Sequence, residues 1–219
     1  ADFGTTMAAY AKRKPVIDGV LSDGEWETRL PVMLDKNSVF ELTSGAYSGS
    51  DDLAANVYLE WDEENLYIAA NVTDDVFLQE HDGNMMWMDD SIQIGDSGEA
   101  VNNSSYTSYT ELCVGLTKNG AQINKSSNDS GVGKAITDSK AEINNKGTET
   151  IYEIKLPWDE IISDDVKVKA GNVLRFNIMV NDNDGAGRWG WVIHTPGMGN
   201  KKYSQTFAYM LLYSEELSK

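Results

Sequence analysis

The sequence has almost no cysteine and few basic residues. Cys113 is the only cysteine among 219 residues, so no disulfide can form within the chain. Lys and Arg number 18 against 35 Asp and Glu, a formal net charge of −17. This charge repels phosphate backbones and anionic lipids, which excludes nucleic acid as a partner. No run approaches the roughly 18 apolar residues of a spanning helix, so no membrane partner is expected.

Recognisable catalytic motifs are also missing. The chain contains no nucleophile elbow, no phosphate-binding loop, no dinucleotide fingerprint and no zinc-protease motif. Its two histidines, His81 and His194, lie far apart in the sequence. Acidic residues are so abundant that no pair stands out for glycoside hydrolysis. We therefore expect a protein that is not an enzyme, although it can be an accessory part of a larger one.

The patterns that are present are those of β-strands. Residues 54–62 and 65–75 alternate apolar and polar side chains across a short polar turn, which predicts a β-hairpin. Short helical turns are predicted only near residues 22–29 and 157–163. We predict an all-β chain: one two-sheet, mostly antiparallel β-sandwich, jelly-roll or immunoglobulin-like, that spans residues 1–219. The other predicted strands are residues 90–96, 106–116, 150–158, 172–182 and 206–214.

The parity of the side chains along these strands predicts which face is buried. Residues of one parity are apolar and are expected to fill one core. The opposite face carries large and polar residues together, a composition that suits a concave binding surface. The predicted core residues are Val57, Leu59, Ile68, Ile92, Leu112, Val114, Ile154, Phe176 and Ile178. The residues of the opposite face include Gln93, Tyr109, Glu111, Arg175 and Met179.

A segment rich in Asn and Asp suggests a metal site. Residues 181–185 read Asn-Asp-Asn-Asp-Gly, which resembles the opening of a calcium-binding loop. The later bidentate Glu of an EF-hand loop is absent, so that family is not indicated. The same residue types also favour β-turns, and both interpretations stay open. If a metal binds, we expect structural calcium on oxygen ligands, with Asp182 and Asp184 as ligands.

Tryptophans are the more specific feature. Trp61 ends an apolar alternating face, and Trp26 and Trp158 lie in short apolar turns, so these three are expected to pack in or against the core. Trp87 lies instead in a polar, Met-rich loop before a strand. Trp191 lies in a Gly-rich segment together with Trp189. Aromatic rings stack on the C–H faces of sugars, and nearby amides and carboxylates bind the hydroxyls.

Five segments resemble family 9 carbohydrate-binding modules and their relatives, in the same order and with similar spacing. They are KPVIDGVLSDGEWE (14–27), VYLEWDEENLYIAANVTDDV (57–76), WMDDSIQI (87–94), YEIKLPW (152–158) and LRFNIMVNDND (174–184). The resemblance implies a β-sandwich that binds sugars derived from plant polysaccharides, with structural calcium. It further implies an extracellular or cell-surface location, with other domains of a larger polypeptide as possible neighbours.

The resemblance also assigns positions in the binding site. Trp87 falls on the first of two tryptophans that grip the sugar. Gln93 stands where relatives carry an acidic residue, Glu111 where an arginine is expected, and Met179 where a glutamine is expected. These departures leave the fold inference intact but weaken any inference that the sugar's reducing end is recognised.

The second gripping tryptophan belongs near residues 200–203, where this chain has none. Trp191, His194 and Tyr203 are the candidates to replace it. The ligand-binding residues predicted on this basis are Trp87, Gln93, Tyr109, Glu111, Met179, Trp191 and Tyr203.

Two other classes of function stay open at this point. Related DOMON-like sandwiches hold haem b between their sheets, with Met and His or Lys as axial ligands. The candidates for such ligands in this chain are Met85, Met86, Met88 and Met179 with His194 or Lys201. The second class is a purely structural module of a surface protein, in which the sugar site has degenerated.

Overall fold

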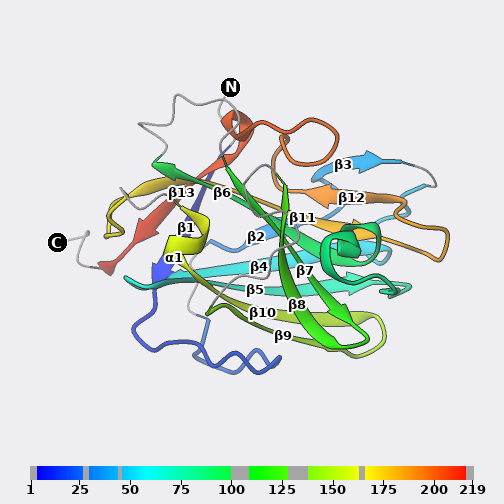
Figure 1. Ribbon diagram of the computed structural model, residues 1–219, viewed down its shortest axis with the longest axis horizontal. Coiled ribbons are helices and arrows are strands. Elements are labelled where there is room, and N and C mark those ends of the chain that lie inside the picture. Colours follow the sequence, from blue (N-terminus) through cyan, green and yellow to red (C-terminus); the bar gives the residue numbers. More distant parts are fainter. Residues whose placement is uncertain are drawn as a thin grey trace.

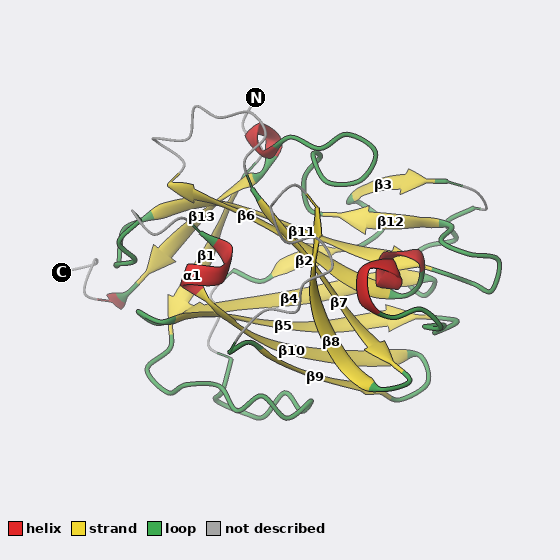
Figure 2. Ribbon diagram, viewed as in Figure 1, coloured by secondary structure: helices red, strands yellow, loops and turns green. Residues whose placement is uncertain are grey.

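The structure is a computed structural model that describes residues 4–26, 30–43, 46–99, 109–127, 138–162 and 166–215. Strands dominate its regular structure, with three short helical segments between them (Figures 1 and 2). The helical segments are η1 (Gly83–Met88), α1 (Trp158–Ile161) and η2 (Ser204–Thr206). The strands are β1 (Thr5–Tyr10), β2 (Val32–Leu34), β3 (Val39–Leu42), β4 (Leu53–Trp61), β5 (Asn65–Asp74), β6 (Ser91–Glu99), β7 (Thr110–Thr117), β8 (Gly120–Ser127), β9 (Lys140–Asn145), β10 (Glu149–Pro157), β11 (Val173–Asp182), β12 (Gly190–Ile193) and β13 (Ala208–Tyr213).

One hydrogen-bonded network joins these strands. The order along the sheet is β8–β7–β6–β11–β13–β1–β4–β5–β10–β9, with β12 linking β11 to β3 and β2 beside β4. Strand β1 runs parallel to both β13 and β4, whereas the other pairings of described strands are antiparallel. The end strands β8 and β9 contact each other, so the sheet curls into a nearly closed, barrel-like sandwich (Figure 1). The all-β prediction is confirmed, but the division into two separate sheets is not.

The predicted hairpin forms between β4 and β5. The two strands pair antiparallel with Leu59 opposite Ile68. Asp62 closes the turn, because its Oδ1 accepts hydrogen bonds from the backbone N–H of Glu64 (2.8 Å) and of Asn65 (2.7 Å). The same register places the start of β4 beside the end of β5, and this edge carries the acidic residues described below.

The parity prediction for the core is confirmed. All nine predicted core residues belong to one buried cluster, to which Trp61 and Trp158 also contribute. The predicted helical turn after Pro157 is α1, and the buried Trp158 donates its indole N–H to the backbone oxygen of Asp62 at 2.8 Å. Residues 23–25 form a turn without a helix, and residues 27–29 of that prediction lie outside the described part of the chain.

The outer face of β11 is buried as well. A second apolar cluster covers it, built from the residue before β7, from β11 and β12, and from the chain between β12 and β13. This cluster is the apolar support beneath the cleft described below. Its members are Tyr109, Met179, Trp191, Ile193, Met198 and Phe207.

Gly95 of β6 permits this second cluster to pack closely. A Cβ atom at Gly95 would lie 2.7 Å from both Met198 Sδ and the Phe207 ring. We expect Gly95→Ala to cost about 1–3 kcal/mol of unfolding free energy, the usual penalty for overpacking, in chemical denaturation. Gly98→Ala is the matched control, because its Cβ would meet only Val166 Cγ2, at 3.3 Å. Equal stability of the two variants would contradict this packing argument.

Candidate functional site

A cleft of about 260 Å³ opens where η1 and the strands β6, β7 and β11 meet the chain on both sides of β12. This volume is close to the lower end of the roughly 300–1,000 Å³ found for small-molecule sites. The cleft therefore suits a small ligand, held by one aromatic ring and several polar groups. Its lining residues are Trp87, Gln93, Glu111, Met179, Arg188, Met198, Gly199 and Lys202.

Glu111 is the polar centre of the cleft. Its side chain is completely buried, and its carboxylate accepts hydrogen bonds from Gln93 Nε2 (2.7 Å) and Tyr109 OH (2.8 Å). Lys202 Nζ lies 2.7 Å from one carboxylate oxygen and 2.8 Å from the other. A buried charge needs such a complete set of partners, since an unpaired one is strongly destabilising. The set also fixes the lysine at the mouth of the cleft, where about a third of its side chain is exposed.

A second chain of hydrogen bonds orients Gln93. Its Oε1 accepts from Asn181 Nδ2 at 3.1 Å, which directs the Gln93 amino group toward Glu111. Asn181 also donates to Ser91 Oγ at 3.0 Å. Arg188 Nη1 in turn donates to Asn181 Oδ1 at 3.1 Å. The amide of Gln93 and the guanidinium are therefore held in defined orientations before any ligand enters.

Arg188 contacts both tryptophans of this region. Its guanidinium carbon lies 4.6 Å from the centre of the Trp87 ring and 4.2 Å from that of Trp191, within cation–π distance. Burial lowers the pKa of Arg188, whereas the negative charges of Glu111 and Glu41 act in the opposite direction. The guanidinium nevertheless stays protonated, because arginine does not lose its charge in proteins.

The predicted ligand-binding residues divide into two groups. Trp87, Gln93, Glu111 and Met179 line the one cleft, and Trp87 is half-buried there. Trp191 is fully buried beneath Arg188, so it offers no ring face to a ligand in this structure. The three predicted residues that do not line the cleft are Tyr109, Trp191 and Tyr203.

Each of these three residues lies outside the lining of the cleft for a different physical reason. Tyr109 is buried in the second apolar cluster, where its hydroxyl supports Glu111. The chain from residue 194 to 207 covers the face to which Trp191 points. Tyr203 lies partly buried outside the lining. The lining residues that sequence reasoning missed are Arg188, Met198, Gly199 and Lys202.

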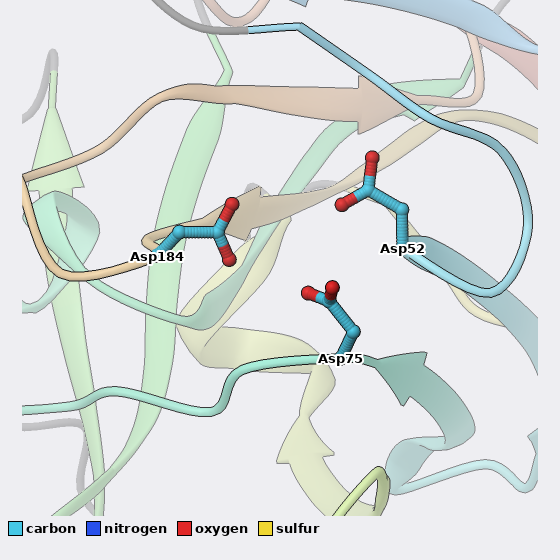
Figure 3. Close-up of side chains that lie close together, drawn as sticks. All are labelled: Asp52, Asp75 and Asp184. Atoms are coloured by element: carbon cyan, nitrogen blue, oxygen red, sulfur yellow. The ribbon is translucent and has the colours of Figure 1, made fainter.

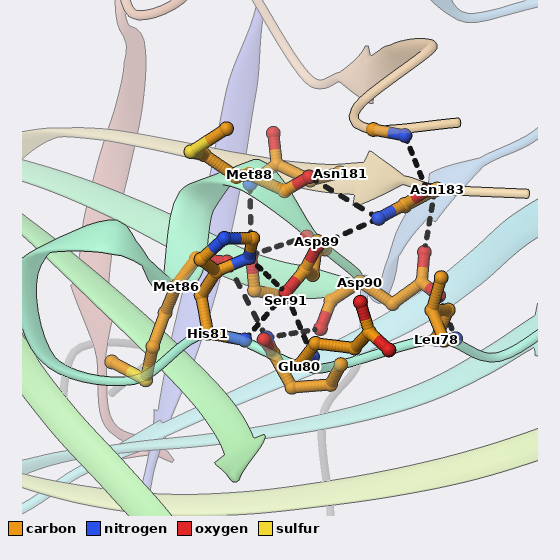
Figure 4. Close-up of polar contacts among 12 residues, drawn as sticks. Leu78, Glu80, His81, Met86, Met88, Asp89, Asp90, Ser91, Asn181 and Asn183 are labelled. Carbon is orange, nitrogen blue, oxygen red and sulfur yellow. Dashed lines mark hydrogen bonds and ion pairs between the residues drawn. The ribbon is translucent and has the colours of Figure 1, made fainter. Parts of the chain in front are cut away.

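Buried acids hold the segment that carries Trp87. Asp89 Oδ2 accepts hydrogen bonds from the backbone N–H groups of Glu80 and His81 and contacts His81 Nδ1, each at 2.8 Å (Figure 4). Asn183 donates its side-chain amide to Asp89 Oδ1 at 2.6 Å and its backbone N–H to Asp90 Oδ1 at 2.8 Å. The loop after β11 is thereby fastened to the end of η1.

A group of aspartates lies at the edge where β4 begins and β5 ends. Carboxylate oxygens of Asp52, Asp75 and Asp184 lie within 4.8 Å of one another (Figure 3), and so do those of Asp74, Asp182 and Asp184. Two oxygens on opposite sides of one calcium ion are separated by about 4.8 Å, so this spacing fits calcium. Asp182 Oδ1 is buried and has no hydrogen-bond partner, which is a second feature that favours a cation.

The charges of this group disturb one another. Burial, followed by the charge of Asp184, raises the pKa of Asp182 to about 7. Burial and the same neighbour raise the pKa of Asp74 to about 7. Asp182 and Asp184 are the predicted ligands, whereas Asp52, Asp74 and Asp75 were not predicted. The loop 18–25, also acidic, contributes no group of this kind among the described residues.

The haem alternative finds little support in this geometry. Met179 lines the cleft, but neither His194 nor Lys201 does. Lys202 does line it, yet its amine is engaged by Glu111. No observation on the described residues therefore favours haem over a small polar ligand.

The fold and the cleft together define a class: an all-β module with one aromatic ring among polar groups. The family model described as "Carbohydrate family 9 binding domain-like" matches residues 17–212, and the chain belongs to this family. Among curated proteins, none matches the chain. None of the helices in the described ranges has the length and apolar character needed to cross a membrane.

Solved structures share the fold. One is a carbohydrate-binding module of family 9 from Caldicellulosiruptor kristjanssonii in complex with cellotriose, with a TM-score of 0.66, 21% identity, and coverage of 96% of this chain and 94% of that one. A family 9 module from Caldicellulosiruptor kristjanssonii in complex with glucose has a TM-score of 0.65 and 20% identity, with coverage of 96% of each chain. A putative carbohydrate-binding protein from Bacteroides uniformis has a TM-score of 0.56 and 9% identity, with coverage of 95% of this chain and 99% of that one.

Proposed function

We propose that this protein is a non-catalytic carbohydrate-binding module whose cleft holds a monosaccharide or the end of a short oligosaccharide. The observation that carries the proposal is the position of Trp87, whose half-buried ring lines a small cleft together with Gln93, Glu111 and Lys202. A sugar presents an apolar C–H face and a rim of hydroxyl groups, and this lining offers a partner for each. The similar modules solved with cellotriose and with glucose support the same class of ligand.

The proposed contacts follow from the chemistry of each residue. The sugar ring stacks on Trp87, while the Gln93 amide and the Lys202 ammonium bind hydroxyls and the buried Glu111 carboxylate holds both groups in place. With Trp191 buried, the grip depends on one tryptophan, and the thioether side chains of Met179 and Met198 complete the apolar surface. We further propose that the sugars derive from plant polysaccharides and that the module acts outside the cell, beside other domains of a larger polypeptide.

Calorimetric titration with glucose, xylose, cellobiose and cellotriose tests this function. A cleft with few contacts is expected to bind at least one of them with a Kd of roughly 10 µM to 1 mM, equal to about 4 to 7 kcal/mol. The tryptophan fluorescence should change over the same range of concentration. If neither signal changes at about tenfold higher concentrations, the cleft does not bind sugar and the structural-module alternative is favoured. A Soret band after haem addition would instead support the redox alternative.

We also propose that calcium binds at the aspartate group and has a structural role. Asp182, with its buried and unpartnered Oδ1, and Asp74 and Asp184 would supply oxygen ligands, the donor type that calcium prefers. The ion would neutralise carboxylates that burial and mutual repulsion now disfavour. No sugar contact is assigned to it.

A further inference from the structure

Arg188 is a charged group that the proposed sugar contacts leave unused. Its guanidinium carbon lies over two indole rings, and its Nη1 donates one hydrogen bond to Asn181 Oδ1. Arginine has five N–H donors, so several remain for the cleft that Arg188 lines. A neutral sugar needs no guanidinium to satisfy its hydroxyls, and this one is present in a chain whose net charge is −17.

No carboxylate is paired with this cation. Arg188 takes part in none of the ion pairs within 4.0 Å that the described residues form. Glu111 is already saturated by Gln93, Tyr109 and Lys202, and together with Glu41 it acts on Arg188 only from a greater distance. A half-buried charge without a directly bonded counterion lowers the stability of the folded protein. Charges of this kind are found most often at functional sites.

The position of the charge indicates what would neutralise it. The guanidinium carbon lies close to both rings, and one Nη1–H is donated to Asn181, so several N–H groups remain for a ligand. The edge of a guanidinium group matches the two oxygens of a carboxylate, which it binds through parallel hydrogen bonds. Lys202 lines the same small cleft, and its charge is already balanced by Glu111. Arg188 is therefore the cation of the lining that has no carboxylate within ion-pair distance among the described residues.

We propose that the preferred ligand of this cleft is an acidic sugar, a hexuronic acid unit whose carboxylate pairs with Arg188. The proposal rests on the sugar-binding function above and specifies its substrate class. The sugar ring contacts Trp87, and its hydroxyls contact Gln93 and Lys202. The net charge of −17 repels long polyanions, so the ligand is a single or terminal uronic acid unit rather than a polyuronate chain.

The first test compares ligands on the unaltered protein. Glucose, glucuronic acid, galacturonic acid and the methyl esters of both acids are titrated by calorimetry near pH 7. At least one acid should bind about tenfold or more tightly than glucose and than its own ester, the effect of one charge-assisted hydrogen bond. Glucose 6-sulfate serves as a second anion, and tighter binding of the sulfate than of either acid overturns the carboxylate assignment. Equal binding of acid and ester overturns the proposal but leaves neutral sugar binding intact. Absence of binding by every sugar overturns both.

The second test removes the charge from the protein. Arg188→Gln should abolish the difference in affinity between the acid and its ester. Arg13→Gln is the matched control, because Arg13 is exposed and does not line the cleft. Thermal melting shows whether Arg188→Gln is folded, and the comparison of acid with ester decides the question if it is not. A preference for the acid that survives in folded Arg188→Gln also overturns the proposal.

Discussion

Chelation of divalent cations is expected to lower the melting temperature of this protein by about 5–10 °C near pH 8. A cation present at a hundredfold its Kd stabilises the folded state by about 2.7 kcal/mol. For a chain of this size, each kcal/mol changes the melting temperature by roughly 2–4 °C. The residues concerned are Asp74, Asp182 and Asp184, whose oxygens meet the spacing for one calcium ion.

The size of this effect should depend on pH. In the cation-free protein, burial first and the charge of Asp184 next raise the pKa of Asp182 to about 7, and Asp74 behaves alike. A raised pKa in the folded state gives stability that is fully present below the unfolded pKa of about 4 and is lost as the pH rises through 7. The chelated protein should therefore lose stability between about pH 4 and pH 8. With calcium bound, the carboxylates stay ionised and the melting temperature should change much less.

Calcium titration of the chelated protein, followed by differential scanning calorimetry at several pH values, measures both effects. Asp182→Asn should abolish the calcium response and, in chelator near pH 8, should melt no lower than the unaltered protein. Asp23→Asn is the control, since Asp23 is exposed in the acidic loop near the N-terminus. The proposal is wrong if chelation leaves the melting temperature unchanged and elemental analysis finds no bound metal.

The core could be predicted from the sequence because strand parity is a local signal. Ile92 and Phe176 lie in two separate alternating runs. The burial of each in the shared core could be predicted from its own run, without knowing which strands lie beside it. The same parity placed Gln93, Glu111 and Met179 on the opposite face, which is why three of the predicted site residues line the cleft. What parity cannot show is whether that opposite face is open or covered.

Trp191 illustrates this limit. It was a candidate for the second gripping aromatic residue, but β12 is an interior strand with β11 on one side and β3 on the other. The second apolar cluster then buries Trp191 completely. A strand of only four residues gives too short a pattern to distinguish an interior strand from a loop. Arg188 was missed for a related reason: the partners of its long side chain, Trp87 and Asn181, come from other elements.

The unpredicted aspartates did leave a signal in the sequence. Asp52 stands just before the first strand of the hairpin, and Asp74 and Asp75 stand at the end of the second. Antiparallel strands joined by a short turn bring those two ends together, as the pairing of Leu53 with Asp74 shows. The predicted hairpin therefore already implied an acidic edge. The approach of the loop with Asp182 and Asp184 to that edge depends on the whole sheet and could not be predicted.

Trp87→Ala is expected to abolish measurable sugar binding while the protein stays folded. The substitution removes the one tryptophan ring that lines the cleft, and with it the cation–π partner that helps to hold Arg188. Because Trp87 is only half-buried, its loss should cost clearly less stability than the roughly 3–5 kcal/mol of a fully buried aromatic residue. Calorimetric titration with the best ligand and urea denaturation measure the two quantities.

Trp191→Ala supplies the matched contrast, because the two indoles contact the same guanidinium but only Trp191 is fully buried. We expect Trp191→Ala to lose about 3–5 kcal/mol of unfolding free energy. Trp87→Phe keeps a smaller ring in the cleft and should retain weakened binding. If Trp87→Ala instead loses as much stability as Trp191→Ala, Trp87 is a packing residue. If Trp87→Ala is folded and binds sugar as the unaltered protein does, the ligand lies elsewhere, because no other aromatic ring lines this cleft among the described residues.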